Sequence, residues 1–357
     1  LGRYRPRFND STHLNDDRIL MKQTGKRWGL RRLATPEGFF TMAAIDQRPP
    51  ISKFIARKRC ITETDVSDQE ISTIKGLLAQ GLAPSAGALL VDPNYGYSAA
   101  AEFLRPDRGL LITLEDHRFE EDDRGRKSRL IANWSVEKIR RMGADAVKLL
   151  AWYRPDASAD SLTHQHEFVR RVGEECAKYD IAFVFELLVY PFGSASGSFK
   201  DYLEDPNKQA EHVVNSVLEF SNPVYQVDLL KLESPIPAPL LPDPQSEHAA
   251  SVQLTFDALS KACQGLPWVL LSAGAGFDEF TRAMTFAARA GASGFLAGRA
   301  LWADLIEPYP DQTEVIKNLK TIGAQRISRL QEIVMQYGEP WRPHYDWSKG
   351  LSLSEHY

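Results

Sequence analysis

Residues 146–190 read AVKLLAWYRPDASADSLTHQHEFVRRVGEECAKYDIAFVFELLVY, and this stretch decides the fold. Two runs of apolar, β-branched and aromatic residues, 146–153 and 182–190, flank a segment at 162–179 whose apolar residues follow a helical spacing. Short apolar runs on either side of an amphipathic helix are typical of a parallel sheet, whose strands are buried on both faces. The stretch therefore predicts a strand–helix–strand unit.

The same alternation extends along the chain in both directions. Eight apolar runs are expected to be strands: 39–46, 88–92, 109–116, 146–153, 182–190, 227–235, 267–276 and 294–303. Helices are expected at 65–80, 97–104, 135–142, 162–179, 205–220, 251–264, 278–290 and 311–337. Eight such units over about 260 residues match a (β/α)₈ TIM barrel, and no GxGxxG motif opens an early helix as in a doubly wound dinucleotide-binding sheet. We predict an α/β protein with a single TIM barrel at 21–337, an N-terminal appendage at 1–20 and a C-terminal tail at 338–357.

The composition of the 357-residue chain is that of an ordinary globular protein, with 43% hydrophobic and 25% charged residues, which excludes a disordered or collagen-like chain. The net charge of −4 leaves no basic excess for nucleic acid or anionic lipid, so neither is an expected partner. The cysteines Cys60, Cys176 and Cys263 are odd in number and lack CxxC spacing. Because the sequence also shows no secretory signal and no run long enough to span a bilayer, a reducing, cytoplasmic location is expected.

Ionisable residues inside the predicted strands are the feature that points to function. Five of them occur in the expected strands 1, 4, 5 and 6: Asp46, Lys148, Glu186, Lys231 and Glu233. A charge in a buried strand costs several kcal/mol unless it is paired or used. One such residue can belong to a structural ion pair, but five that can converge at one barrel mouth indicate a site.

The side-chain direction follows from the period of a strand. Lys231 and Glu233 are two residues apart, so they point to the same side. That side is the barrel interior if Leu230 and Leu232 face the helices.

Two lysines with carboxylates nearby suit amine catalysis. A lysine attacks a carbonyl carbon only when its amine is neutral, and burial beside a second cation favours the neutral form. Lys148 and Lys231 supply such a pair, and Glu186 is placed to accept and return protons as an imine forms and a carbon–carbon bond breaks. Metal-assisted chemistry would instead require histidine and carboxylate ligands at strand ends, where only His117 lies near one. We expect a Schiff-base mechanism with no metal and no other cofactor.

The last two predicted strands each end in a turn of small residues. LSAGAG at 271–276 precedes a helix, and LAGRA at 296–300 repeats the pattern with Arg299. Backbone N–H groups at such turns hold phosphate, and the loops after strands 7 and 8 are the usual phosphate site of TIM barrels. Tight turns alone would also explain the glycines, but two of them in consecutive strands favour phosphate.

These motifs resemble the class I tagatose 1,6-bisphosphate aldolase family. The resemblance runs in chain order from about Gly38 to Trp302, through AAIDQR (43–48), NWSVEKIRRMGADAVKLLAWY (133–153), FVFELLVY (183–190), VDLLKLESP (227–235), LSAGAG (271–276) and GFLAGRALWA (294–303). It implies a TIM barrel, a homodimer and a phosphorylated ketose as substrate.

The resemblance also implies roles for individual residues. Lys231 would form the Schiff base with the substrate ketone, Glu186 would be its acid/base partner, and Lys148 and Asp46 would orient hydroxyls and tune the charge. The substrate- and phosphate-binding set would be Gln47, Glu233, Ser272, Ala273, Gly274, Gly298 and Arg299.

The chain departs from the family pattern where the distal end of the substrate would bind. Pro49 and Pro50 replace the glycine that usually follows the DQR triplet, and the loop at 234–245 is unusually rich in proline, which makes it either a lid or a plain surface loop. The charged segment at 115–129 is either a solvated loop or a source of cations for a second phosphate, namely Arg124, Arg126, Lys127 and Arg129.

The expected reaction is reversible cleavage of a ketose 1,6-bisphosphate, with tagatose 1,6-bisphosphate first, to dihydroxyacetone phosphate and glyceraldehyde 3-phosphate. One alternative is an aldolase for a sulfonated ketose phosphate, 6-deoxy-6-sulfofructose 1-phosphate. The other is a metabolite-sensing regulator that retains the aldolase pocket without relying on turnover.

Overall fold

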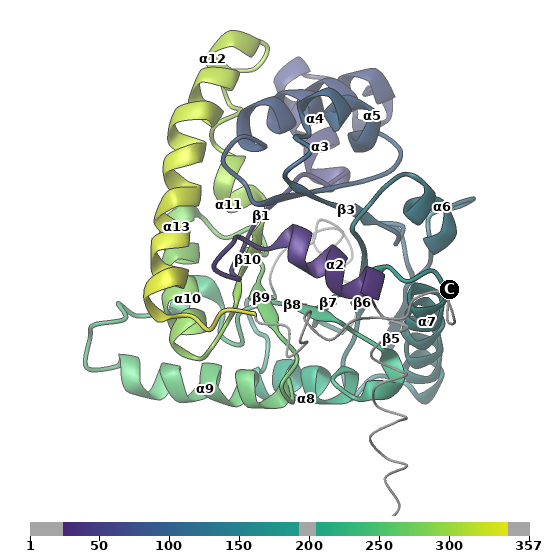
Figure 1. Cartoon of the computed structure of the whole chain (residues 1–357), viewed down its shortest axis with the longest axis vertical. Helices are drawn as coiled ribbons and strands as arrows, with labels where there is room; N and C mark the ends of the chain where they lie inside the picture. Colours follow the sequence, from purple (N-terminus) through teal and green to yellow (C-terminus); the bar gives the residue numbers. More distant parts are fainter. Residues whose placement is uncertain (1–23, 193–204, 342–357) are drawn as a thin grey trace, which may run out of the picture.

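The computed structural model describes residues 24–192 and 205–341, so the appendage expected at 1–20 and most of the tail at 338–357 lie outside it. Eight parallel strands close into a barrel in the order β1–β2–β3–β6–β7–β8–β9–β10 (Figure 1). Their bounds are β1 (Phe40–Ala44), β2 (Ala88–Val91), β3 (Gly109–Thr113), β6 (Ala146–Trp152), β7 (Ala182–Leu188), β8 (Leu229–Leu232), β9 (Trp268–Leu270) and β10 (Gly294–Ala297). The predicted TIM barrel and its eight strands are confirmed.

Helices surround the barrel at each position where the sequence predicts one. Their bounds are α2 (Thr24–Leu33), α3 (Pro49–Arg59), α4 (Asp68–Leu82), α5 (Gly96–Ala100), α6 (Val136–Arg141), α7 (Ala159–Lys178), α8 (Ala210–Phe220), α9 (Ala249–Ala262), α10 (Phe277–Arg289), α11 (Arg299–Trp302), α12 (Gln312–Asn318) and α13 (Ala324–Tyr337). Three of them, α2, α3 and α11, are not predicted. Pro49 and Pro50 occupy the first two positions of α3, where their missing N–H groups cost nothing, so this departure from the family motif opens a helix.

The last two strands are much shorter than predicted. The run at 294–303 was expected to be one strand, but β10 ends at Ala297 and α11 begins at Arg299. The run at 267–276 likewise ends as a strand at Leu270. In both runs the small residues form the turn that leaves the sheet, so an apolar composition alone overstates the strand length.

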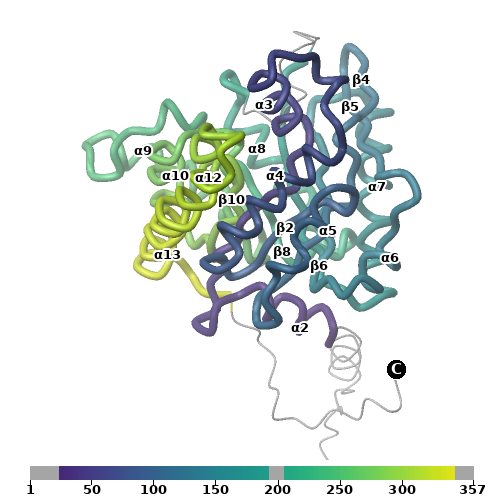
Figure 2. Tube along the Cα trace, turned by 90° about the horizontal axis from the view of Figure 1, so that it is seen from above, coloured from purple at the N-terminus to yellow at the C-terminus, as the bar shows by residue number. Residues whose placement is uncertain are grey.

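The inside of the barrel is apolar toward the N-terminal ends of the strands. Phe40, Met42, Val184, Leu229 and Leu296 belong to one buried cluster with Leu30 and Leu33 of α2. Seen from the side, α2 lies across one end of the barrel, and α3 with the β4–β5 hairpin (Glu120–Asp122, Gly125–Lys127) lies at the other end (Figure 2). Because α2 closes the N-terminal end of the strands, the open end is the one where TIM-barrel active sites form.

A buried ion pair fastens α2 to the closed end. Lys26 is 1% exposed, and its Nζ lies 2.8 Å from Asp228 Oδ2 and donates to the Gln226 carbonyl at 3.2 Å. Asp228 directly precedes β8 and also accepts a hydrogen bond from the Phe183 amide at the start of β7. This pair is therefore structural, and it lies at the opposite end of β8 from Lys231.

The charged segment at 115–129 is ordered around one arginine. Arg126 on β5 is 3% exposed, and its guanidinium lies 4.4, 4.8 and 4.6 Å from the ring centroids of Phe119, Trp152 and Tyr190. Its Nε also donates to Glu121. Cation–π contacts with three aromatic rings hold this guanidinium, so Arg126 is not part of a solvated loop, and its contact with a second phosphate stays a prediction.

Candidate active site

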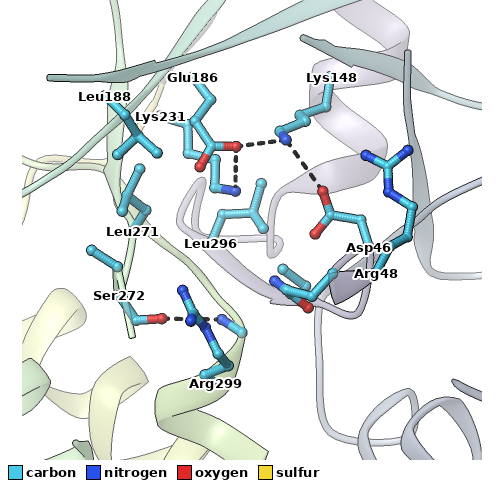
Figure 3. A pocket seen from close by; sticks show the side chains of 14 residues that line it. Asp46, Arg48, Lys148, Glu186, Leu188, Lys231, Leu271, Ser272, Leu296 and Arg299 are labelled. Carbon is cyan, nitrogen blue, oxygen red and sulfur yellow. Dashed lines mark hydrogen bonds and ion pairs between the residues drawn. The ribbon is translucent and has the colours of Figure 1, made fainter. Parts of the chain in front are cut away.

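Lys148 is the central cation of the open end of the barrel. Its side chain on β6 is 2% exposed, and its Nζ lies 3.2 Å from Asp46 Oδ2, 2.5 Å from Glu115 Oε1 and 2.7 Å from Glu186 Oε2. These carboxylates come from the ends of β1 and β3 and from β7. Figure 3 shows the Lys148 amine lying between Glu186 and Asp46. Three carboxylates around one buried ammonium offset the cost of its burial, and removing one of them would be costly.

Lys231 on β8 contacts the same Glu186 carboxylate from the other side of β7. Glu186 and Lys231 are register partners on β7 and β8, and both side chains point into the barrel. The Lys231 Nζ donates to Glu186 Oε2 at 2.9 Å, so this one oxygen contacts both lysines. Leu230 and Leu232 belong to the core outside the barrel, as the period-two argument required. The structure thus brings together Asp46, Lys148, Glu186 and Lys231.

Glu115 is a site residue that the sequence analysis did not single out. It is 1% exposed, and while Oε1 contacts Lys148, Oε2 accepts a hydrogen bond from the Leu150 amide at 3.1 Å. The signal was present, because Glu115 follows the apolar run of strand 3 as Asp46 follows that of strand 1. Glu115 was instead interpreted as part of the charged segment at 115–129.

The charge of Asp46 is set by its surroundings. Burial acts to raise the pKa of this carboxyl, but Lys148, Lys231, Lys75 and Arg48 outweigh the burial and lower the pKa to about 2. Asp46 is therefore an anion at every physiological pH. The group is a permanent hydrogen-bond acceptor at the mouth of the barrel.

The turns after β9 and β10 face the same cavity. Ser272, Ala273, Gly298, Arg299 and Gln47 line it together with both lysines. The Ser272 Oγ accepts a hydrogen bond from the Gly298 amide at 3.4 Å, which joins the two turns. A Cβ atom at Gly298 would lie 2.6 Å from Gln47 Nε2, so glycine lets Gln47 pack against this turn.

The structure separates two of the expected residues from the cavity. Gly274, at φ +89°, supplies the left-handed conformation of the turn but is not among the residues that line the cavity. Glu233 is 2% exposed and does not line it either, because its carboxylate accepts from the Val189 amide at 2.7 Å and pairs with Lys208 Nζ at 2.8 Å. Glu233 therefore joins the ends of β7 and β8.

The cavity is open to solvent at the mouth of the barrel. Leu188 and Leu271 form an apolar part of its wall and belong to a buried cluster with Leu150, Trp152 and Tyr190. The lining of the cavity thus contains both ionisable and aliphatic groups. A polar ligand with a carbon backbone has contacts for both parts.

His117 lies beyond the mouth and is not a cation at neutral pH. Burial lowers its pKa to about 4, and Arg48, Arg118 and Arg129 add to this effect while Asp116 opposes it. Within the described residues, no group of three or more His, Cys, Asp or Glu is arranged to hold a metal ion.

The other segments considered for the distal end are fixed to the scaffold. Lys127 pairs with Asp160 on α7, and Arg129 lies 3.7 Å from Asp116. The proline-rich loop at 234–245 is attached to α10, because Arg282 and Arg289 donate to the carbonyls of Leu241 and Pro244 at 3.2 and 2.8 Å. None of the residues of this loop lines the cavity.

Comparison with known proteins decides the family. The model of the DeoC/LacD family of aldolases matches residues 40–304, a span that includes every residue lining the cavity. The chain belongs to the DeoC/LacD aldolase family. Tagatose 1,6-diphosphate aldolase 2 of Enterococcus faecalis is 33% identical over 344 residues, which cover 93% of this chain and 100% of that protein.

Further relatives agree with this aldolase assignment. Tagatose 1,6-diphosphate aldolase of Lactococcus lactis subsp. lactis is 30% identical, with 88% of this chain and 97% of that protein covered. A solved structure of fructose-bisphosphate aldolase from Plasmodium falciparum superimposes with a TM-score of 0.62 at 12% identity, over 90% of this chain and 96% of that one. The latter likeness shows a shared barrel fold.

The Asp46→Asn variant tests the charge cluster through acid stability. The pKa of Asp46 is about 2 in the folded protein and about 3.9 in an unfolded chain, so its contribution is present above pH 4 and is lost as the pH falls toward 2. The variant should be less stable than the wild type by about 2 kcal/mol at pH 7 and by about half as much at pH 3, measured by urea unfolding. A stability difference that does not change with pH would contradict the cluster.

Proposed function

We propose that this aldolase cleaves a ketose 1,6-bisphosphate, with tagatose 1,6-bisphosphate as the first candidate, to dihydroxyacetone phosphate and glyceraldehyde 3-phosphate through a Schiff base on Lys231. The observation that carries the proposal is the single Glu186 oxygen that contacts both lysine amines inside the cavity. The tagatose 1,6-diphosphate aldolases among the relatives support the choice of substrate.

The geometry favours Lys231 over Lys148 as the nucleophile. Among residues 24–192 and 205–341, Lys148 contacts three carboxylates, whereas the Lys231 amine contacts one, which Lys148 shares. An amine must lose its proton to attack a carbonyl carbon, and the amine with fewer anionic partners loses it at the lower cost. Glu186 Oε2 lies 2.9 Å away and is positioned to receive that proton.

The reaction then proceeds in balanced steps. The neutral Lys231 amine adds to C2 of the ketose, and the carbinolamine loses water, with Glu186 as acid/base, to give a protonated imine. As the C3–C4 bond breaks, its electrons move into the imine to form an enamine, and the C4 hydroxyl gives its proton to Glu186, or to Asp46 as second choice. The aldehyde leaves, the enamine is protonated at C3, and hydrolysis of the imine releases dihydroxyacetone phosphate and the free amine.

The turns after β9 and β10 are the proposed site for the C1 phosphate. Ser272, Gly298 and Arg299 line the same cavity as Lys231, and Arg299 supplies a guanidinium for a charge-assisted contact. Fixing C1 there presents the C2 carbonyl to Lys231, which lowers the entropic part of the barrier.

Borohydride trapping tests the nucleophile. Wild-type protein reduced in the presence of the ketose bisphosphate should carry a mass adduct on the peptide that contains Lys231, and the Lys231→Met variant should carry none. Glu186→Gln should lower kcat by about 10² to 10⁴, because an acid/base group is removed while the amine remains. A protein that a chelator inactivates and that gives no adduct would contradict the mechanism.

A substrate panel distinguishes the proposed reaction from its alternatives. The panel consists of tagatose 1,6-bisphosphate, fructose 1,6-bisphosphate and 6-deoxy-6-sulfofructose 1-phosphate, compared by kcat/KM. We expect the highest value for tagatose 1,6-bisphosphate; the highest value for the sulfonated sugar would identify the other aldolase. Tight binding of a sugar phosphate without turnover would instead identify the regulator.

We also propose that the enzyme acts in the cytoplasm as a homodimer. Cys60, Cys176 and Cys263 are all free thiols, which favours a reducing compartment. Within the described residues no helix has the length and apolar character of a membrane span. Light scattering of the purified protein measures the number of subunits.

A further inference from the structure

Lys75 is a fully buried lysine that the mechanism does not use. It lies on α4, outside the barrel, among the apolar residues Ile71, Ile74 and Leu78 that face the core. Its side chain is 0% exposed, and burial lowers the pKa of its amine. A cation in such a place needs strong partners to offset the loss of its hydration.

The partners of Lys75 are the backbone groups on either side of Asp46. Its Nζ donates to the Ile45 carbonyl at 2.6 Å and to the Gln47 carbonyl at 2.9 Å. The same amine lies 2.5 Å from Asp92 Oδ2, at the end of β2. Lys75 thus donates hydrogen bonds to the carbonyls of the residues directly before and after Asp46.

Asp92 fixes Lys75 from the next strand. It is 0% exposed, and its Oδ1 accepts hydrogen bonds from the Asn94 and Tyr95 amides at 3.1 and 2.8 Å. The carboxylate is therefore held by its own turn while its other oxygen meets the lysine. This arrangement leaves Lys75 little freedom to shift, and through it the segment 45–47 has a fixed position relative to β2.

We propose that Lys75, held by Asp92, is a positioning residue that sets where Asp46 and Gln47 stand in the cavity. This inference rests on the proposed function, since it assigns Lys75 a part in the same aldol cleavage. Asp46 meets Lys148 at 3.2 Å, and Gln47 packs against the Gly298 turn, so a shift of the 45–47 segment moves contacts on both sides of the cavity. Lys75 touches neither the cavity nor the reacting atoms.

A double-mutant cycle tests this role. Lys75→Met should lower kcat about tenfold to 100-fold, because a misplacement of about 1 Å in a catalytic group has an effect of this size. Combining it with Asp46→Asn should add little, since the group that Lys75 positions has already been disabled. Borohydride should still trap the substrate on Lys231 in Lys75→Met, because Lys75 itself contacts Ile45, Gln47 and Asp92, and neither Lys231 nor Glu186.

The chain supplies a matched control in Lys26. This lysine is also buried, pairs with an aspartate and donates to a backbone carbonyl, but it lies at the closed end of the barrel. Lys26→Met should reduce stability while leaving kcat of the folded protein within about twofold of wild type, and its effect should be additive with Asp46→Asn. A loss of activity caused only by a missing buried ion pair would appear in both lysine variants.

The remaining outcomes also decide the inference. If Lys75→Met does not fold, Asp92→Asn replaces it, because an asparagine keeps the acceptor for the Asn94 and Tyr95 amides; a smaller fall in kcat with the same non-additivity is expected. Additive effects of residues 75 and 46 on kcat, with normal trapping by the wild type, would overturn the inference alone.

A wild type without turnover or adduct would overturn the proposed function. In that case the same double-mutant cycle is measured by the urea midpoint of unfolding at pH 7. Non-additivity of residues 75 and 46 there, together with additivity of residues 26 and 46, would support the positioning contact. Additivity of both pairs would refute it.

Discussion

The burial of one lysine ammonium among three carboxylates organises the open end of this barrel. Lys148 holds the ends of β1 and β3 and the middle of β7 to β6 through Asp46, Glu115 and Glu186. An ammonium buried alone would cost several kcal/mol, so each carboxylate that approaches it is strongly favoured and each strand end is drawn inward. The cavity has its polar side where these strands meet.

The proposed chemistry follows from the different numbers of carboxylates that the two lysines contact. Both contact Glu186, but Lys148 has two further anionic partners and Lys231 makes its buried ion pair with this carboxylate. One Glu186 oxygen therefore bridges the two amines, and in the proposed mechanism it receives the proton of Lys231. The proposed mechanism uses both lysines, which lie on β6 and β8, on either side of Glu186 on β7.

The alternation of apolar runs and helices in the sequence predicted the barrel. The four central ionisable residues were predicted because charged residues are unexpected in buried strands. Lys148, Glu186 and Lys231 interrupt apolar strands, and Asp46 ends one, so the cost of burying them made them visible. Glu115 was missed although it obeys the same rule. Lys75 is also a charge on an apolar face, but its partners are backbone carbonyls from another element, and only the folded chain shows them.

In loops, composition carries less information than packing. The cations at 124–129 read as possible anion ligands, yet Arg126 is enclosed by aromatic rings from β6, the segment after β7 and its own loop. Helix α2 was missed because its buried Lys26 pairs with Asp228, which lies about 200 positions away in the sequence. Long-range pairs of this kind have no local signature.

In the proposed mechanism Lys231, and not Lys148, is the amine that bonds to the substrate. The most direct measurement is a crystal structure of the wild-type protein frozen after reduction with borohydride and dihydroxyacetone phosphate. We expect continuous density from Lys231 Nζ to C2, with Lys148 still in contact with Asp46, Glu115 and Glu186. A bond to Lys148, or a sugar phosphate bound without any bond to an amine, would contradict it.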